Sequence, residues 1–282
     1  HNMTVNTKHY SYAQGANVAM GGLFGYASGA LRNVTIAEDC SIQVAAAGSQ
    51  DIYAGGICGI LNGGFIDNCH NRANIETRAF GGDIYAAGVV GRDNSYLPVY
   101  NSSNSGNIVA ESEYGEICAS GLVAVNAYVV NGYNTGAVSA QGPTVYVGGI
   151  SADYARLRNV YNAGAITATG TSGGVFINPI TNNVVADVEN AYYDVACVAD
   201  APGADTEGTG MQADEMKTAD FAALLTSNAA AWMNAFPDAA QLYAWEIQAN
   251  ENNGYPVFGA AIEAGGWWTS EGNYDASWYD AS

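Results

Sequence analysis

The sequence has little charge and little proline, which limits the classes of protein to which it can belong. Only 12% of its 282 residues are charged and 6 are proline, whereas 49% are hydrophobic and 19 are tyrosine. Disordered chains show the opposite composition, with more charge and fewer aromatic residues. The composition therefore excludes a disordered chain. With 35 glycines, it indicates a folded, turn-rich β protein.

Basic residues and long apolar runs are especially scarce. The chain has 8 Lys and Arg against 27 Asp and Glu, a net charge of −19, and residues 187–282 hold 16 of the acids with one lysine. Nucleic acids and anionic lipids bind clusters of Lys and Arg, and a membrane helix needs about 20 apolar residues. We therefore expect no nucleic-acid partner and no membrane contact by this segment itself. Its acidic character favours an extracellular location, at the cell surface or secreted.

The chain also lacks the motifs of several common enzyme classes. Its three histidines are His1, His9 and His70, and none lies in a His-Glu-x-x-His motif. There is no Gly-x-Ser-x-Gly sequence and no phosphate-binding loop with a lysine. We therefore expect no catalytic residues, no metal site and no cofactor.

What the sequence does contain is a repeat of two short pieces. The clearest copy is Tyr53-Ala-Gly-Gly-Ile-Cys-Gly59 followed, after a short variable stretch, by Ile66-Asp-Asn-Cys-His-Asn-Arg-Ala-Asn-Ile75. Six copies align on one glycine position. Their period drifts over about 25–34 residues, which predicts an array of one supersecondary unit. The anchors are Gly22, Gly56, Gly88, Gly121, Gly149 and Gly174.

The second piece carries two asparagines at a constant spacing of i and i+3 in four of the copies. Asparagine tolerates the left-handed conformation at a sharp corner, and its side chain can bond neighbouring backbone or another amide stacked above it. We therefore predict two columns of asparagines that form a structural ladder. The pairs are Asn68 and Asn71, Asn101 and Asn104, Asn131 and Asn134, and Asn159 and Asn162.

Short apolar or alternating runs bounded by Gly and Asn predict strands, and a unit of two or three strands cannot bury its own face. A propeller would need longer units, usually of four strands each. We therefore predict an all-β fold, a right-handed parallel β-helix (solenoid) of about six coils over residues 1–186. Residues 187–262 are expected to form a small C-terminal cap with one or two helices. Residues 263–282 are expected to be a linker or the start of a further domain.

One helix is predicted over residues 211–225, where Met216, Phe221 and Leu224 recur at helical spacing. A hydrophobic helix at this place would cap the last coil, which otherwise exposes an unpaired edge.

The five cysteines are an odd number without a Cys-x-x-Cys motif. Cys69 occupies a position that other copies fill with small, mostly apolar residues, which is typical of a core position. This pattern favours buried free thiols over the alternative, a Cys58–Cys69 disulfide. The equivalent residues are Ser102, Gly132, Val160 and Ala191.

The glycine-apolar piece followed by the asparagine frame resembles the GLUG-motif repeats of bacterial cell-surface proteins. These repeats also occur beside the protease domain of immunoglobulin A1 peptidases and in adhesin-like proteins. The resemblance covers about residues 18–195 and is strongest around Gly56 and Gly149. The first and sixth copies depart from it, because they lack the second asparagine. The resemblance implies a β-helical, adhesin-like segment, and the missing metalloprotease motif means that peptidase activity is not implied.

Three kinds of candidate site remain. Glu111 with Glu113, and Glu38 with Asp39, are carboxylate pairs near in sequence, but neither pair recurs or has an evident basic partner, so solvated surface is favoured. The acidic stretch of Asp194, Asp200, Asp205 and Glu207 and the segment 250–254 are rich in oxygen ligands. Neither matches a calcium loop, and the second is interpreted as a turn. Tyrosines outside the repeat frame could stack on sugars, namely Tyr10, Tyr26, Tyr96, Tyr114 and Tyr154.

Taken together, these features favour a non-enzymatic β-helical segment of a bacterial surface or secreted protein. It would act as an adhesin-like stalk or as a binding module for a host glycan or an extracellular protein. Two alternatives stay open: a carbohydrate-active enzyme, a polysaccharide lyase or glycosidase that uses one face as a groove, and a spacer with no ligand.

Overall fold

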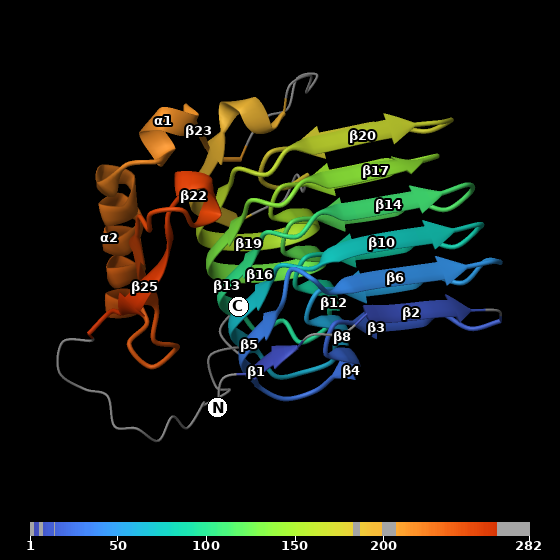
Figure 1. Ribbon diagram of the computed structural model, residues 1–282, viewed down its shortest axis with the longest axis horizontal. Coiled ribbons are helices and arrows are strands. Elements are labelled where there is room, and N and C mark those ends of the chain that lie inside the picture. Colours follow the sequence, from blue (N-terminus) through green and yellow to red (C-terminus); the bar gives the residue numbers. More distant parts are fainter. Residues whose placement is uncertain (1–2, 6–7, 14, 183–186, 199–206, 264–282) are drawn as a thin grey trace. The chain divides into compact units, whose positions relative to one another are not determined.

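The computed structural model describes residues 3–5, 8–13, 15–182, 187–198 and 207–263. The chain divides into two compact units, residues 1–216 and 217–282. The first unit is a parallel β-solenoid, so the predicted fold class is confirmed (Figure 1). Of the predicted linker, residues 264–282 lie outside the described part of the chain.

The solenoid strands stack in register into three parallel sheets. The strands that follow the asparagine frame form a six-stranded sheet, which Figure 1 shows as a stack from β2 to β20. Its strands are β2 (Lys8–Ala13), β6 (Ser41–Ala46), β10 (Asn74–Ala79), β14 (Ile108–Ser112), β17 (Val138–Gly142) and β20 (Ile166–Gly170). A second six-stranded sheet contains β3 (Val18–Gly21), β7 (Ile52–Gly55), β11 (Ile84–Ala87), β15 (Ile117–Ser120), β18 (Val145–Gly148) and β21 (Val175–Asn178).

The third sheet has 11 strands in two rows. One row contains β4 (Phe24–Ala27), β8 (Cys58–Leu61) and β12 (Val90–Asp93). The other contains β1 (Met3–Val5), β5 (Leu31–Ile36), β9 (Ile66–Asn71), β13 (Val99–Asn104), β22 (Asp187–Asp194) and β23 (Thr209–Met211). Two longer strands, β16 (Val123–Asn134) and β19 (Ser151–Asn162), belong to both rows, because each continues through the corner that longer coils make with a loop.

A complete coil therefore has four strands, as in β7 to β10, and not the two pieces seen in the sequence. The first piece is bent between Gly55 and Cys58, which ends β7 and begins β8. The last strand of the coil, such as β10, follows the asparagine frame directly. Its alternating burial marks one inward and one outward face.

Aliphatic side chains at equivalent positions form columns inside the coils. Consecutive coils pair these residues directly, and the side chains are at most 4% exposed. Burying one aliphatic side chain stabilises a fold by about 1.5–3 kcal/mol, so each added coil extends a continuous core. One such column contains Ile42, Ile75, Ile108, Val138 and Ile166.

The second asparagine of each pair lies inside the solenoid and closes a corner. Asn71, Asn104, Asn134 and Asn162 are fully buried and stand one above the next. Each Nδ2 of the first three donates to the Oδ1 of the next, always at 2.8 Å. The same amide also donates to the backbone carbonyl at position i+2, for example from Asn104 to Gly106 at 2.8 Å. The buried amide groups are thereby paired.

The first asparagine of each pair turns the chain in the left-handed conformation. Its φ lies between 47° and 62° in Asn68, Asn101, Asn131 and Asn159. Neighbouring side chains bond in this column as well, from Asn131 to Asn101 at 2.9 Å and from Asn159 to Asn131 at 2.7 Å. One step differs, because Asn101 donates to Asp67 at 2.8 Å.

The glycine position and the inner asparagine column depend on each other. A Cβ built on Gly56, Gly88, Gly121 or Gly149 would overlap both the backbone of the next coil and the side chain of the inner asparagine. Glycine therefore makes room for the amide, in addition to allowing close stacking of the coils.

The sixth anchor predicted from the sequence, Gly174, is wrong. Strand β21 pairs with β18 so that Asn178 lies opposite Gly148, and a Cβ on Gly149 would meet the carbonyl of Pro179. Pro179 therefore occupies the anchor position, and the last interval is longer than the one that Gly174 implied. The apolar residues after Gly174 resemble those that follow the anchor glycine in other copies. The strand pairing instead places them in β21, before the bend at which the anchor lies.

All five cysteines are buried and free, so the prediction of buried thiols is confirmed. Cys69 lies in the inner column opposite Val34, and burial raises the pKa of its thiol to about 12. A short 3-10 helix, η1 (Val195–Cys197), and helix α1 (Ala213–Met216) complete the first unit.

The second unit contains helix α2 (Ala219–Ala235), strands β24 (Tyr243–Glu246) and β25 (Val257–Ala261), and a 3-10 turn, η2 (Asn252–Gly254). The single helix predicted over 211–225 is thus two helices, with Thr218 between them. Its hydroxyl caps α2 by accepting from Phe221 N at 3.2 Å. The hydroxyl of Thr226 accepts from Trp245 N at 2.8 Å and so ties α2 to the hairpin. The capping role of this region stays a prediction.

We predict that Asn104→Ala destabilises the protein by about 2–4 kcal/mol, because the change removes one hydrogen-bond partner from each of three buried groups, the side-chain amides of Asn71 and Asn134 and the carbonyl of Gly106. Chemical denaturation measures the loss. Asn17 is an exposed asparagine that bonds Asp51 on the surface, so Asn17→Ala is the matched control and should cost less than about 1 kcal/mol. Equal losses in the two variants would contradict the structural role of the inner column.

We also predict that Gly88→Ala prevents the native fold, because the added methyl group would overlap Gly121 O and the Asn104 side chain. Gly81→Ala is the control, since a Cβ there lies 3.3 Å from the nearest atom, Gly48 O, a tight contact without overlap that should leave the protein folded. Circular dichroism and thermal unfolding distinguish the two. A native Gly88→Ala protein would show that the inner corner has room to spare.

Candidate functional site

Aromatic side chains form an outward column on the sheet of β7, β11, β15, β18 and β21. Tyr53 stacks on Tyr85 with ring centroids 5.0 Å apart, and Tyr146 stacks on Phe176 at 4.7 Å. Cys118 lies in register between the two pairs. Because the rings cover one another's faces, this column stabilises the sheet and offers mainly ring edges to a ligand. The sequence alignment missed Phe176 because it placed the sixth anchor at Gly174.

Four of the five candidate tyrosines are exposed. Tyr26, Tyr96, Tyr114 and Tyr154 have exposed fractions of 58%, 66%, 64% and 64%. Tyr10 lies in β2 opposite Gln43, but its side chain is outside the described part of the structure. The structure does not bring all of them together.

Tyr114 and Tyr26 lie apart from the other exposed tyrosines. Tyr114 belongs to the turn between β14 and β15, where its ring contacts Phe80 edge-on at 5.1 Å. Tyr26 is in β4 of the coil formed by β3 to β6, opposite Ile60. Neither residue has a positive φ.

Tyr96 and Tyr154 occupy the same corner in coils two apart. Tyr96 lies three positions before Val99 and Tyr154 three before Leu157, and these two aliphatic residues are aligned through Val129. Both tyrosines have left-handed backbone, with φ of 57° and 48°. A bulky residue rarely adopts this conformation, and such outliers concentrate at functional sites.

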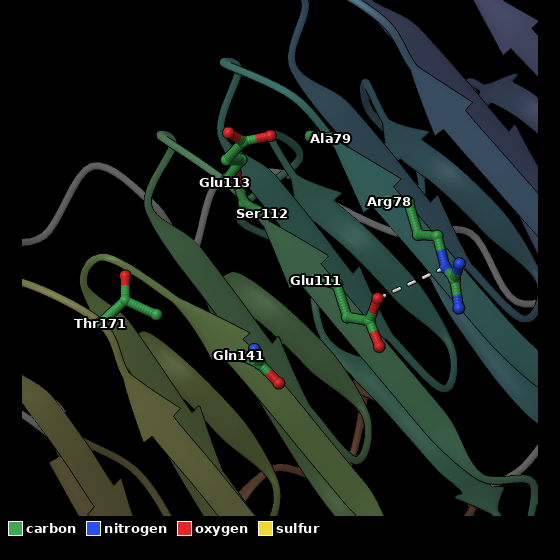
Figure 2. A pocket seen from close by; sticks show the side chains of 7 residues that line it. All are labelled: Arg78, Ala79, Glu111, Ser112, Glu113, Gln141 and Thr171. Carbon is green, nitrogen blue, oxygen red and sulfur yellow. Dashed lines mark ion pairs between the residues drawn. The ribbon is translucent and has the colours of Figure 1, made fainter.

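A hollow of about 480 Å³ lies on the outer face of the β10–β14–β17–β20 sheet (Figure 2). Figure 2 shows Arg78, Glu111 and Glu113 beside it, with an ion pair of 3.4 Å between Arg78 and Glu111. Arg78 also pairs with Glu76 at 3.0 Å. The remaining lining residues are Ala79, Ser112, Gln141 and Thr171.

The expectation that Glu111 has no basic partner is therefore wrong. Arg78 belongs to the preceding coil, and the strand register places it directly opposite Glu111. The side chains of Arg78 and Glu111 are 62% and 45% exposed, so solvent screens the pair and limits its energy to about 0–1 kcal/mol. Glu38 and Asp39 are exposed in the turn after β5, as expected for solvated acids.

His70 is part of the repeat frame, in register with Ser103 and Thr35. Its Nε2 donates to Asn68 Oδ1 at 2.9 Å, and its Nδ1 accepts from the Ser103 hydroxyl at 2.8 Å. Burial, together with the nearby Arg72, lowers the pKa of His70 to about 4. The imidazole is therefore neutral at pH 7. Its Nε2 bonds the outer asparagine column at Asn68, and its Nδ1 bonds Ser103 of the next coil.

Asp93 is an acid that sequence reasoning missed and that the fold buries completely. It ends β12 opposite Leu61, at a position facing the core. Its Oδ1 accepts from Ser95 N at 2.7 Å and from the Ser95 hydroxyl at 2.6 Å. Its Oδ2 is buried without a hydrogen-bond partner among the described residues, and burial raises the pKa of Asp93 to about 6. The sequence signal for this burial is Leu61, a core residue that holds the equivalent position in the previous coil.

The two oxygen-rich segments behave differently from each other. Asp194 accepts from Ala196 N at 2.8 Å and so begins η1, whereas Asp200 and Asp205 are outside the described residues. The segment 250–254 is a turn, as predicted, with left-handed backbone at Asn250, Asn252 and Asn253. In the described part of the chain no group of three or more His, Cys, Asp or Glu lies close enough to hold a metal ion.

The register of the strands and the two asparagine columns define this unit as a parallel β-solenoid. Comparisons with protein-family models, with curated proteins and with solved structures found no match. No helix among the described residues has the length and apolar character of a membrane span.

We predict that Asp93 makes the protein less stable as the pH rises from about 4 to about 6. Its folded pKa lies above the unfolded value of 3.8, so the native state binds the proton more tightly and loses that advantage as the carboxyl ionises. Above pH 6 the free energy of unfolding should be about 3 kcal/mol lower than at a pH below 4, as far as Asp93 is concerned.

The measurement compares the unfolding free energies of the wild type and Asp93→Asn across this pH range. The difference between the two proteins is needed because His70, whose pKa is lowered, gives the opposite slope in a similar range. A wild-type curve parallel to that of Asp93→Asn would show that Asp93 is not buried as an acid.

Proposed function

We propose that this chain is a non-enzymatic, adhesin-like β-solenoid segment of a bacterial surface or secreted protein. It acts as a binding module for a host glycan or an extracellular protein. The observation that carries this proposal is the set of tyrosines held more than half exposed on a rigid stack of coils. An aromatic ring with a polar tip suits wet recognition surfaces, and a solenoid positions such rings at fixed intervals. The resemblance of the Gly56 and Gly149 copies to GLUG repeats supports the same role.

The acidic charge also bears on the partner. The net charge of −19 disfavours polyanionic partners and is compatible with extracellular solubility. The proposed segment therefore binds neutral or basic surfaces in preference to nucleic acid or anionic lipid.

One observation favours a second candidate, a carbohydrate-active enzyme. Glu111, Glu113 and Arg78 line the hollow of Figure 2, and paired carboxylates are the groups that glycosidases use. The hollow is open, and its arginine and Glu111 are exposed. Such exposure gives little of the water exclusion on which catalysis relies.

We predict that the purified chain binds members of a glycan array or of a panel of extracellular matrix proteins, and that polysaccharide substrates are not cleaved. Binding is measured with labelled protein, with heat-unfolded protein as the control. Cleavage is measured as new reducing ends or unsaturated uronic acids. Turnover that disappears in Glu111→Gln would establish the enzyme, and absence of both binding and turnover would leave a spacer.

A further inference from the structure

The left-handed corner at Tyr96 and Tyr154 carries an inference about the ligand. Counting back three positions from the aligned strand residues gives Gly63, Tyr96, Asn126 and Tyr154 in four successive coils. All four have positive φ, of 110°, 57°, 60° and 48°. Glycine and asparagine are the residues that this conformation favours, whereas tyrosine is not.

Most of the surface of the two tyrosines lies outside the packing at this corner. Tyr96 and Tyr154 are 66% and 64% exposed, so they face mainly solvent. A residue that adds backbone strain and stays largely in water is explained more readily by a ligand than by stability.

The spacing suits an extended ligand. Neighbouring parallel strands lie about 4.8 Å apart, so the aligned residues Val99 and Leu157, each three positions after one of the tyrosines, are separated by about 10 Å. The partly exposed Asn126 lies on the intervening coil, in register with Tyr154. Two aromatic rings with an amide between them offer stacking faces and hydrogen bonds to successive parts of a linear chain.

The polar groups beside the corner indicate an uncharged ligand. Asn94, two positions before Tyr96, is exposed. It donates to Asn62 at 2.9 Å and accepts from Arg92 at 3.0 Å. Asp153 precedes Tyr154 and accepts from its backbone N–H at 2.9 Å. Amides flank the rings, and the cation and the carboxylate beside them, Arg92 and Asp153, have opposite charges, which suits the hydroxyl groups of a neutral chain.

We propose that Tyr96, Asn126 and Tyr154 form a binding site for a linear neutral glycan, which lies along the stacking direction of the coils. The inference rests on the proposed binding function and deepens it by naming the ligand class and the site. The sugar rings stack on the two tyrosines, and their hydroxyl groups bond the amides of Asn94 and Asn126.

The test uses the full chain and two probes, affinity electrophoresis through gels containing neutral polysaccharides (mannan, xylan, β-glucan) and calorimetry with the corresponding oligosaccharides. The double variant Tyr96→Asn, Tyr154→Asn should lose about tenfold or more in affinity for the polysaccharide that binds. Tyr96→Phe with Tyr154→Phe keeps the ring faces and should stay within about threefold. Phe80→Asn is the control, because Phe80 is an exposed aromatic residue in the turn after β10, away from this corner, and the change should leave binding unchanged.

A second readout separates binding from folding. Because asparagine tolerates the left-handed conformation, the double asparagine variant should melt at or above the wild-type temperature while its affinity falls. A lower melting temperature would contradict the claim that the tyrosines are strained.

The failures of the two proposals are distinguishable. If the double asparagine variant bound glycan like the wild type, the site would lie elsewhere and the binding function would stand. If the wild type bound an extracellular protein but no neutral glycan, the glycan inference would be overturned and the binding function would again stand. If it bound neither, both proposals would fall.

Discussion

Four successive coils of the solenoid turn a corner at a fully buried asparagine, and the polar groups of that corner have no access to water. The amide solves this problem twice, by bonding its own backbone at position i+2 and by bonding the amide of the next coil at 2.8 Å. Either bond lost would leave a buried donor or acceptor unpaired. The amide needs space, which exists only because the facing residue is glycine. The anchor glycine and the inner asparagine of the repeat are therefore required together. Because they fix how the coils stack, they also fix the register of the outward side chains.

That inner constraint leaves the outer surface free to vary between coils. The outward column of Tyr53 and Tyr85 uses this freedom for stacking, and the strand register brings Arg78 and Glu111 together as a solvent-screened ion pair. The left-handed corner uses it differently. Gly63 and Asn126 meet the backbone requirement with suitable residues, while Tyr96 and Tyr154 meet it against their conformational preference. This contrast within one column is the main reason to place ligand recognition there.

Several of these features could be predicted from the sequence, and others could not, for identifiable physical reasons. The two asparagine columns follow from a constant i, i+3 interval, because equal spacing in stacked coils puts equal residues on one line. The partner of Glu111 could have been found by subtracting one period, since Arg78 holds the equivalent position in the preceding coil. The anchor at Pro179 could not be predicted, because Gly174 is followed by apolar residues as the other anchors are. Only the pairing of β21 with β18 shows that Pro179, and not Gly174, is the anchor. Asp93 is buried although acids are usually exposed, and the two tyrosines have positive φ although tyrosine disfavours it. A sequence pattern based on the usual preferences of these residue types therefore cannot identify them.

Hydrogen exchange followed by mass spectrometry tests the central claim, that the buried asparagine corners hold the coils together. Peptides spanning residues 71–75, 104–108 and 134–138 should be as strongly protected as the strands themselves, because their backbone N–H groups are paired within the corner or with the next coil. Exchange at the asparagine corners that is much faster than exchange in the flanking strands would contradict the claim and would mean that the aliphatic columns alone maintain the stack.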